Sequence, residues 1–161
     1  MIVYFGLGSN IGNRKENLHN AISMLLEKVG KIIKTSAIYE SEAWGYKSDN
    51  RFLNMVAAVE TMLLPEELLV EIKNIERLFG RPQKTSDGYE DRPIDIDILF
   101  YDNQILETAE LSIPHPRIVR RKFVLAPMVE IAPDFVHPFL CKNIKELNEL
   151  CVDPIQLFED H

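Results

Sequence analysis

Two aspartates separated by one residue, Asp95 and Asp97, are the side chains of this 161-residue protein best suited to chemistry, and Arg92 stands just before them. Apolar and acidic residues alternate from 94 to 98, so a β-strand would place both carboxylates on one face. Same-face residues of a strand lie about 6.5–7 Å apart, and carboxylates that close repel each other unless a cation lies between them. Mg²⁺ prefers carboxylates together with phosphate oxygens, and arginine binds phosphate through its planar fork. The segment indicates a metal and phosphate site, with a solvated strand face as the open alternative.

Four other residues have side chains suited to ligand contact, and each also has a purely structural interpretation. His115 lies between two prolines, a rigid setting that fits either phosphate contact or a turn. Asn54 lies inside an apolar run, where a buried amide must find hydrogen-bond partners. The Asn54 amide could recognise the edge of a heterocycle, or Asn54 could simply be a polar residue at the edge of a strand. Phe52 and Phe123 each begin an apolar run, which on local grounds favours the core over a ligand.

A basic cluster stands out in a chain of net charge −7, and it consists of Arg117, Arg120, Arg121 and Lys122. It indicates either a local anionic ligand or a solvated helix face. The glycine-rich stretch 6–12 lacks the dinucleotide-binding fingerprint, because Ile11 occupies a glycine position. We interpret it as a tight turn after the first strand. The chain has neither the phosphate-binding loop sequence nor the protein-kinase signature set.

Composition is that of an ordinary globular protein, with 46% hydrophobic and 27% charged residues. The length predicts a single domain over residues 1–161. No apolar run approaches the ~20 residues of a membrane span, and the N-terminus is typical of a first strand rather than a signal peptide. Two cysteines without metal-ligand spacing favour free thiols in the cytoplasm. The acidic balance argues against non-specific nucleic-acid binding.

Hydrophobic periodicity predicts the elements that must position these side chains. Strands are expected over 2–7, 31–40, 52–61, a segment containing Asp95 and Asp97, and 104–107. Helices are expected over 13–29 and 65–79, and then over 117–121, 123–131 and 144–150. This order predicts an α+β fold, a ferredoxin-like βαββαβ antiparallel sheet with helices on one face and a C-terminal helical extension. The connections 41–51 and 81–93 are long, which is typical of binding loops.

Six segments, in order, resemble the 6-hydroxymethyl-7,8-dihydropterin pyrophosphokinase family. They are residues 6–13, 39–45, 52–54, 75–76 with 80–81, 91–99, and 114–117 with 121–125. The most specific is 91–99, which matches the family signature. The resemblance implies an ATP-dependent diphosphotransferase of folate biosynthesis, which transfers the β,γ-pyrophosphoryl group of ATP to a reduced pterin and releases AMP. It implies two Mg²⁺ ions, a monomer, and ATP and the pterin as partners, without nucleic acid or membrane.

The resemblance also implies roles for individual residues. Asp95 and Asp97 would bind the two Mg²⁺ ions, and together with Arg81 and Arg92 they form the implied catalytic set. ATP contacts are implied for Glu76, Lys84, Tyr89, Arg92, Ile98, Ser112, His115 and Arg121. Pterin contacts are implied for Ser41, Ala43, Trp44, Phe52, Asn54, Asp95 and Phe123, with the two phenylalanines sandwiching the ring.

Two departures from the family pattern fall in the second long loop. Tyr89 stands where the family often has tryptophan, and Gln83 stands where some members have arginine. The phosphate contacts of that loop would then rest on Arg81, Lys84 and Arg92. Two alternatives remain open. One is a pterin- and nucleotide-binding homologue with weak catalysis, which the intact aspartate pair argues against. The other is a ferredoxin-like nucleic-acid-binding module, which the missing RNP1 pattern and the acidic charge argue against.

Overall fold

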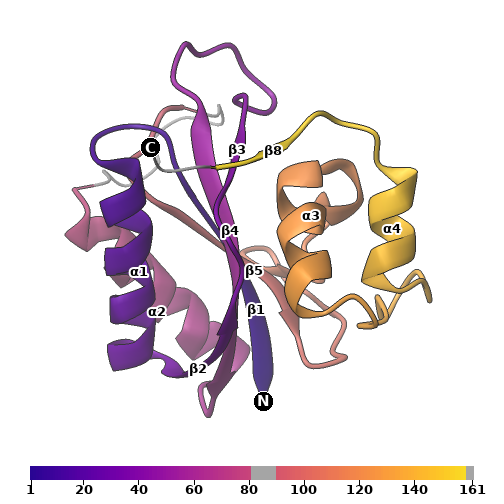
Figure 1. Ribbon diagram of the computed structural model, residues 1–161. Helices are drawn as coiled ribbons and strands as arrows, with labels where there is room; N and C mark the ends of the chain where they lie inside the picture. The colour runs from indigo at the N-terminus through magenta and orange to yellow at the C-terminus, as the bar shows by residue number, and fades with distance from the viewer. Residues whose placement is uncertain (81–89, 159–161) are drawn as a thin grey trace.

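An antiparallel sheet lies at the centre of the molecule (Figure 1), and the computed structural model describes residues 1–80 and 90–158. Its strands are β1 (Ile2–Ser9), β2 (Gly30–Thr35), β3 (Tyr39–Ser41), β4 (Phe52–Thr61), β5 (Asp95–Tyr101) and β8 (Gln156–Leu157). Their order is β5-β1-β4-β3-β8, and β2 also pairs with β4. All of these pairings are antiparallel. A separate two-stranded ribbon joins β6 (Leu106–Glu107) to β7 (Ser112–Ile113).

Helices lie on both faces of the sheet. The two long helices, α1 (Arg14–Lys28) and α2 (Pro65–Leu78), share one face (Figure 1). The 3-10 turn η1 (Ile118–Arg120) and the helices α3 (Lys122–Ile131) and α4 (Ile144–Leu150) follow β5 in the chain. Both α3 and α4 lie on the opposite face. The predicted mixture of helices and antiparallel sheet is confirmed, but the expectation of helices on one face was incomplete. Strand β4 explains why, because its side chains are buried on both faces and need a cover on each.

Helix ends follow the local signals. The Asn13 side chain accepts a hydrogen bond from the Glu16 amide at 3.1 Å, which caps α1. At α4 a capping box is observed. Asn143 accepts from the Glu146 amide at 2.8 Å, and the Glu146 side chain accepts from the Asn143 amide at 3.3 Å. Within the described residues, no helix combines the length and apolar character needed to cross a membrane.

The predicted strand over 31–40 is divided in two. Ser36 interrupts it, since its amide donates to the Val56 carbonyl while its hydroxyl accepts from the Val56 amide, each at 2.9 Å. A side-chain oxygen thus replaces a backbone acceptor, and the chain leaves regular pairing before β3 begins. The expected helix over 117–121 is a single 3-10 turn. Strands β7 and β8 were not predicted, because two residues are too few to show a period.

A register shift divides β5 into two parts whose side chains face differently. Tyr4 pairs with Phe100 but Phe5 pairs with Ile98, so Leu99 is an extra residue on β5. Leu99 and Phe100 therefore both pack into the core beneath α3 and α4. Before this bulge the predicted alternation is observed, with Ile96 and Ile98 buried toward the helices α1 and α2. Asp95 and Asp97 are left on the other face, beyond the part that α3 and α4 cover.

Candidate active site

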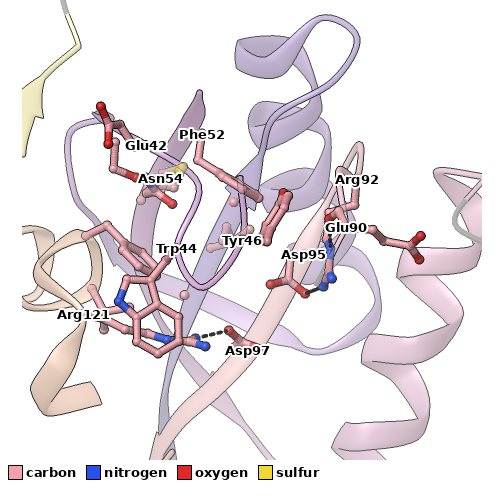
Figure 2. Close-up of a pocket in the computed structure, with 17 residues that line it drawn as sticks. Glu42, Trp44, Tyr46, Phe52, Asn54, Glu90, Arg92, Asp95, Asp97 and Arg121 are labelled. Carbon is pink, nitrogen blue, oxygen red and sulfur yellow. Dashed lines mark hydrogen bonds and ion pairs between the residues drawn. The ribbon is translucent and has the colours of Figure 1, made fainter. Parts of the chain in front are cut away.

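The uncovered part of the sheet forms a pocket with an empty volume of about 590 Å³, including its opening to solvent (Figure 2). Its floor consists of Gly6 and Gly8 of β1, and Asn54 lies beside them on β4. Because glycine has no side chain, these two positions leave the floor hollow. Side chains from β3, β4, β5, the loop 41–51 and the start of α3 surround it, and they include Ser41, Glu42, Trp44, Tyr46, Phe52, Glu90, Arg92, Asp95, Asp97, Arg121 and Phe123.

Gly8→Ala is expected to weaken binding of the reduced pterin that the resemblance implies about tenfold, while the protein stays folded. A methyl group at this position would lie 3.3 Å from Phe52 Cδ1 and 3.4 Å from Asn54 Oδ1, so both side chains must shift. Gly6→Ala is the matched control, because the three atoms nearest to its methyl group would all belong to the flexible Leu99 side chain, at 3.4 Å or more. Titration of each variant with 6-hydroxymethyl-7,8-dihydropterin measures the effect. Unchanged affinity in Gly8→Ala would contradict a role of this floor in binding that ligand.

Each aspartate on β5 is paired with an arginine. Arg92 Nη1 lies 3.1 Å from Asp95 Oδ1, and Arg121 Nη1 lies 3.4 Å from Asp97 Oδ2 (Figure 2). Burial, together with the negative charge of Asp95, raises the pKa of Asp97 to about 7, and Arg121 opposes that shift. The two arginines therefore do not fully offset the cost of holding both carboxylates ionised. A cation would relieve it, and carboxylate oxygens are ligands that Mg²⁺ accepts.

The two aspartates alone do not make a complete metal site. Across the described parts of the chain, no group of three or more histidine, cysteine, aspartate or glutamate side chains is placed to hold an ion. Mg²⁺ usually takes one or two carboxylates and completes its coordination with water and substrate phosphates. The donor set at Asp95 and Asp97 therefore fits a magnesium ion that arrives with a polyphosphate.

Arg121 is 7% exposed and lies between two aromatic rings. Its guanidinium carbon is 4.7 Å from the centre of the Trp44 ring and 5.5 Å from that of Phe123. Its Nε is buried and has no hydrogen-bond partner among the residues that the structure describes. A buried cationic donor without a partner is costly, so this position fits an anionic ligand.

His115 follows β7 and is neutral at physiological pH. Burial and the nearby charge of Arg121 lower its pKa to about 4. Its Nδ1 accepts a hydrogen bond from the Arg117 amide at 3.2 Å, which leaves the ring proton on Nε2. The Leu99 carbonyl accepts from the His115 amide at 3.0 Å and fixes the residue beside β5. His115 can therefore act as a neutral hydrogen-bond donor.

The outer edge of β5 offers backbone groups to a ligand. Glu76 of α2 accepts a hydrogen bond from the Ile96 amide at 3.1 Å, so the backbone N–H of Ile96 points away from β1. Backbone direction alternates along an antiparallel strand, so Ile98 presents its backbone groups at the same edge. Ser112 begins β7, which packs beside β5. The structure thus brings Glu76, Ile98 and Ser112 to the outer edge of β5. This edge is separate from the glycine floor of the pocket.

Most of the remaining predicted residues line the pocket. Asn54 is 4% exposed and donates to Ser41 Oγ at 2.9 Å, so the buried amide has the partner that it needs. Phe52 and Phe123 both line the pocket, whereas Ala43 lines a neighbouring hollow beside α3. Arg81, Lys84 and Tyr89, as well as Gln83, lie outside the described residues. Sequence reasoning assigned no role to Glu42, Tyr46 or Glu90, which also line the pocket.

Paired carboxylates and arginines on a rigid sheet are typical of enzymes that transfer phosphoryl groups. Residues 4–133 match the family described as 7,8-dihydro-6-hydroxymethylpterin-pyrophosphokinase, or HPPK. The chain is 44% identical over 144 residues to the 2-amino-4-hydroxy-6-hydroxymethyldihydropteridine pyrophosphokinase of Aquifex aeolicus, covering 89% of this chain and 88% of that protein. The chain belongs to this pyrophosphokinase family, and the resemblance expected from its motifs is confirmed.

Two further similarities involve larger proteins. The folic acid synthesis protein fol1 of Pneumocystis carinii is 42% identical over 94% of this chain, which spans 20% of that protein. The crystal structure of Plasmodium falciparum HPPK-DHPS with pteroate superposes with a TM-score of 0.75 at 20% identity. It covers 92% of this chain, which spans 42% of the solved chain. At that identity the likeness concerns the fold alone.

Proposed function

We propose that this protein transfers the pyrophosphoryl group of ATP to 6-hydroxymethyl-7,8-dihydropterin, giving the pterin diphosphate and AMP, in folate biosynthesis. The observation that carries the proposal is the Asp95 and Asp97 pair, flanked by Arg92 and Arg121, beside the glycine floor of an aromatic-lined pocket. Family membership supports the same reaction and favours it over a nucleic-acid-binding module.

Asp95 and Asp97 would hold two Mg²⁺ ions that arrive with the triphosphate. Bound there, the ions would neutralise charge on the phosphate oxygens and on the departing AMP. Arg92 and Arg121 would donate charge-assisted hydrogen bonds to the phosphates, and these bonds strengthen as charge develops. His115 would add a neutral donor through Nε2. No side chain is proposed as general base, because the reaction depends mainly on positioning and on charge neutralisation.

The pterin would lie over the glycine floor, between Phe52 and Phe123. Asn54 and Ser41 form a buried polar pair at one side of that space, and they would contact the edge of the heterocycle. Backbone groups near Ala43 and Trp44 would contribute as well. The nucleotide would lie along the outer edge of β5, near Glu76, Ile98 and Ser112. We assign Arg81, Lys84 and Tyr89 to the ATP site from the family resemblance alone.

The strand order also supports a finer description of the fold. The order β5-β1-β4-β3, with α1 and α2 between strands on one face, favours a ferredoxin-like arrangement. We propose that α3 and α4 are its C-terminal helical extension, and that residues 1–161 act as one pyrophosphokinase domain. We further propose a monomer that works in the cytoplasm, where ATP is available and thiols stay reduced.

Incubation of the purified protein with ATP, Mg²⁺ and 6-hydroxymethyl-7,8-dihydropterin tests the reaction, with the nucleotides separated afterwards. We expect AMP to form in amounts equal to the pterin diphosphate, and only when the pterin is present. ADP in place of AMP would mean transfer of a single phosphoryl group. Pterin binding without turnover would instead support the homologue with weak catalysis. EDTA is expected to abolish AMP formation, and excess Mg²⁺ to restore it.

A further inference from the structure

The loop 41–51 closes one side of the pocket although it has almost no regular secondary structure between β3 and β4. Trp44 and Tyr46 both belong to this loop (Figure 2). Trp44 rests against Arg121, but that contact does not explain why Tyr46 lies on the opposite side, near Arg92 and Asp95. A loop of this length needs specific bonds if it is to hold one conformation.

Asn10 supplies the first set of these bonds. It is 2% exposed and follows β1 directly. Its amide donates to the Arg92 carbonyl at 3.1 Å, and its Oδ1 accepts from the Arg92 amide at 2.7 Å. Its Nδ2 lies 3.1 Å from Tyr46 Oη and 3.3 Å from the Asn50 carbonyl. One buried side chain thus contacts both the loop 41–51 and the segment that carries Arg92.

Asp91 supplies the second set. Its Oδ1 accepts hydrogen bonds from Asn10 Nδ2 at 2.8 Å and from the Tyr46 hydroxyl at 2.9 Å. Its Oδ2 accepts from Asn50 Nδ2 at 2.8 Å. A single carboxylate therefore receives donors from the turn after β1 and from two positions of the loop 41–51. Hydrogen bonds to an ionised acceptor are stronger than neutral ones.

Charge supports this arrangement. Burial alone would raise the pKa of Asp91, but hydrogen bonds from Ser48, Asn50, Asn10 and Tyr46 outweigh it and lower that pKa. Burial and the bond to Asp91 raise the pKa of Tyr46 to about 12. At neutral pH the carboxylate is therefore ionised and the phenol keeps its proton, so the donor and acceptor roles are fixed.

The residue next to Asp91 belongs to the proposed catalytic site. Arg92 is 8% exposed, its Nε donates to the Glu90 carbonyl at 3.1 Å, and its Nη1 reaches Asp95. We infer that Asp91, with Asn10, is a positioning residue that docks the loop 41–51 through Tyr46 against the segment that carries Arg92, and so holds this wall of the pterin pocket in place. The inference rests on the proposed function for the identity of the two ligands.

The chain provides its own probe, because Trp44 is its single tryptophan and lies in the docked loop. We expect Asp91→Asn and Tyr46→Phe each to raise the acrylamide quenching of Trp44 about twofold in the ligand-free protein. The dissociation constant of 6-hydroxymethyl-7,8-dihydropterin, measured with Mg²⁺ and a non-hydrolysable ATP analogue, should rise about tenfold. The affinity for the ATP analogue and kcat at saturating pterin should change far less.

Tyr39→Phe is the matched control. It removes another tyrosine-to-carboxylate hydrogen bond, from the Tyr39 hydroxyl to Glu130 at 2.9 Å, which ties β3 to α3. Tyr39 also has a pKa raised to about 12, so the two bonds are chemically alike. Only the Tyr46 bond should alter Trp44 quenching. The effect of the double variant Asp91→Asn/Tyr46→Phe should be smaller than the sum of the two single effects, because both changes act on the same bond.

Three results would overturn the inference. They are unchanged Trp44 quenching in both single variants, an equal effect in Tyr39→Phe, and a loss of kcat without a change in pterin affinity. If Asp91→Asn fails to fold, Tyr46→Phe still tests the contact, since it removes one hydroxyl group. Quenching and binding do not require turnover, so a protein that makes no AMP would contradict the proposed function and leave this test valid.

Discussion

Asp97→Asn is expected to reduce AMP formation about 10³-fold or more while the protein remains folded. Asparagine keeps the size of the side chain but removes the charge, so the site loses half of its proposed magnesium-binding carboxylates. The measurement is single-turnover AMP formation at several Mg²⁺ concentrations, with Asp134→Asn, an exposed carboxylate after α3, as the control. Near-normal turnover in Asp97→Asn would mean that the two-metal assignment is wrong.

The same variant should be more stable than the unmodified protein at alkaline pH. The pKa of Asp97 is about 7 in the folded protein, against an ordinary value of 3.8. Between these values the folded state holds a proton that the unfolded state has lost, so stability falls as the pH rises and the loss is complete above pH 7. Asp97→Asn removes this penalty.

Denaturant unfolding at several pH values measures this difference. At pH 8 without metal we expect a gain in the free energy of unfolding of about 1–2 kcal/mol, moderated because 30% of the Asp97 side chain is exposed. Near pH 4 the gain should vanish. A stability difference that does not depend on pH would show that the carboxylate is not destabilising. Loss of activity together with gain of stability would identify Asp97 as a residue kept for function.

Arg121→Ala is expected to lower kcat about 10²-fold and to change the affinity for a non-hydrolysable ATP analogue much less. The arginine is buried between Trp44 and Phe123, and its contact with phosphate should be strongest when charge develops on the transferred group. Its removal also leaves Asp97 without its cationic neighbour, so the pKa of Asp97 should rise further. More Mg²⁺ should then be needed for half-maximal activity.

Arg120→Ala is the matched control, because Arg120 is the preceding residue and its side chain is exposed. It should behave like the unmodified enzyme. Arg121→Lys should recover only part of the activity, since lysine keeps the charge but cannot lie flat between two rings. A weaker affinity for the ATP analogue with unchanged kcat would contradict a role in the transition state.

Sequence patterns predicted the parts of this site that depend on short-range order. Alternation over 94–98 was enough to place both aspartates on one face, because strand geometry has a period of two. The bulge at Leu99 could not be predicted, because it exists only in the pairing of β5 with β1. Likewise β4 was predicted with its observed bounds, but nothing local indicated the break of the neighbouring strand at Ser36.

The hydrogen-bond network around Asp91 could not be predicted from local sequence patterns. Asn10 and Asp91 are 81 positions apart in the chain, and Tyr46 lies between them in a loop. Each residue is ordinary in its own segment, and only the fold brings the three together. The pyrophosphokinase signature 91–99 includes Asp91, yet the resemblance assigned it no role. Long-range polar contacts of this kind leave no periodic signal in the sequence.

The two glycines on the pocket floor also affect how readily mutations could make this enzyme resistant to an inhibitor. A compound that rests on Gly6 and Gly8 contacts main-chain atoms. No single substitution can remove these atoms from the binding site. A substitution at either position can only add side-chain atoms, and at Gly8 the added atoms would come too close to Phe52 and Asn54. If the pterin uses the same floor, a change that expels the drug also obstructs the natural substrate. Compounds that lie flat on this surface should therefore select resistance more slowly than compounds anchored to side chains.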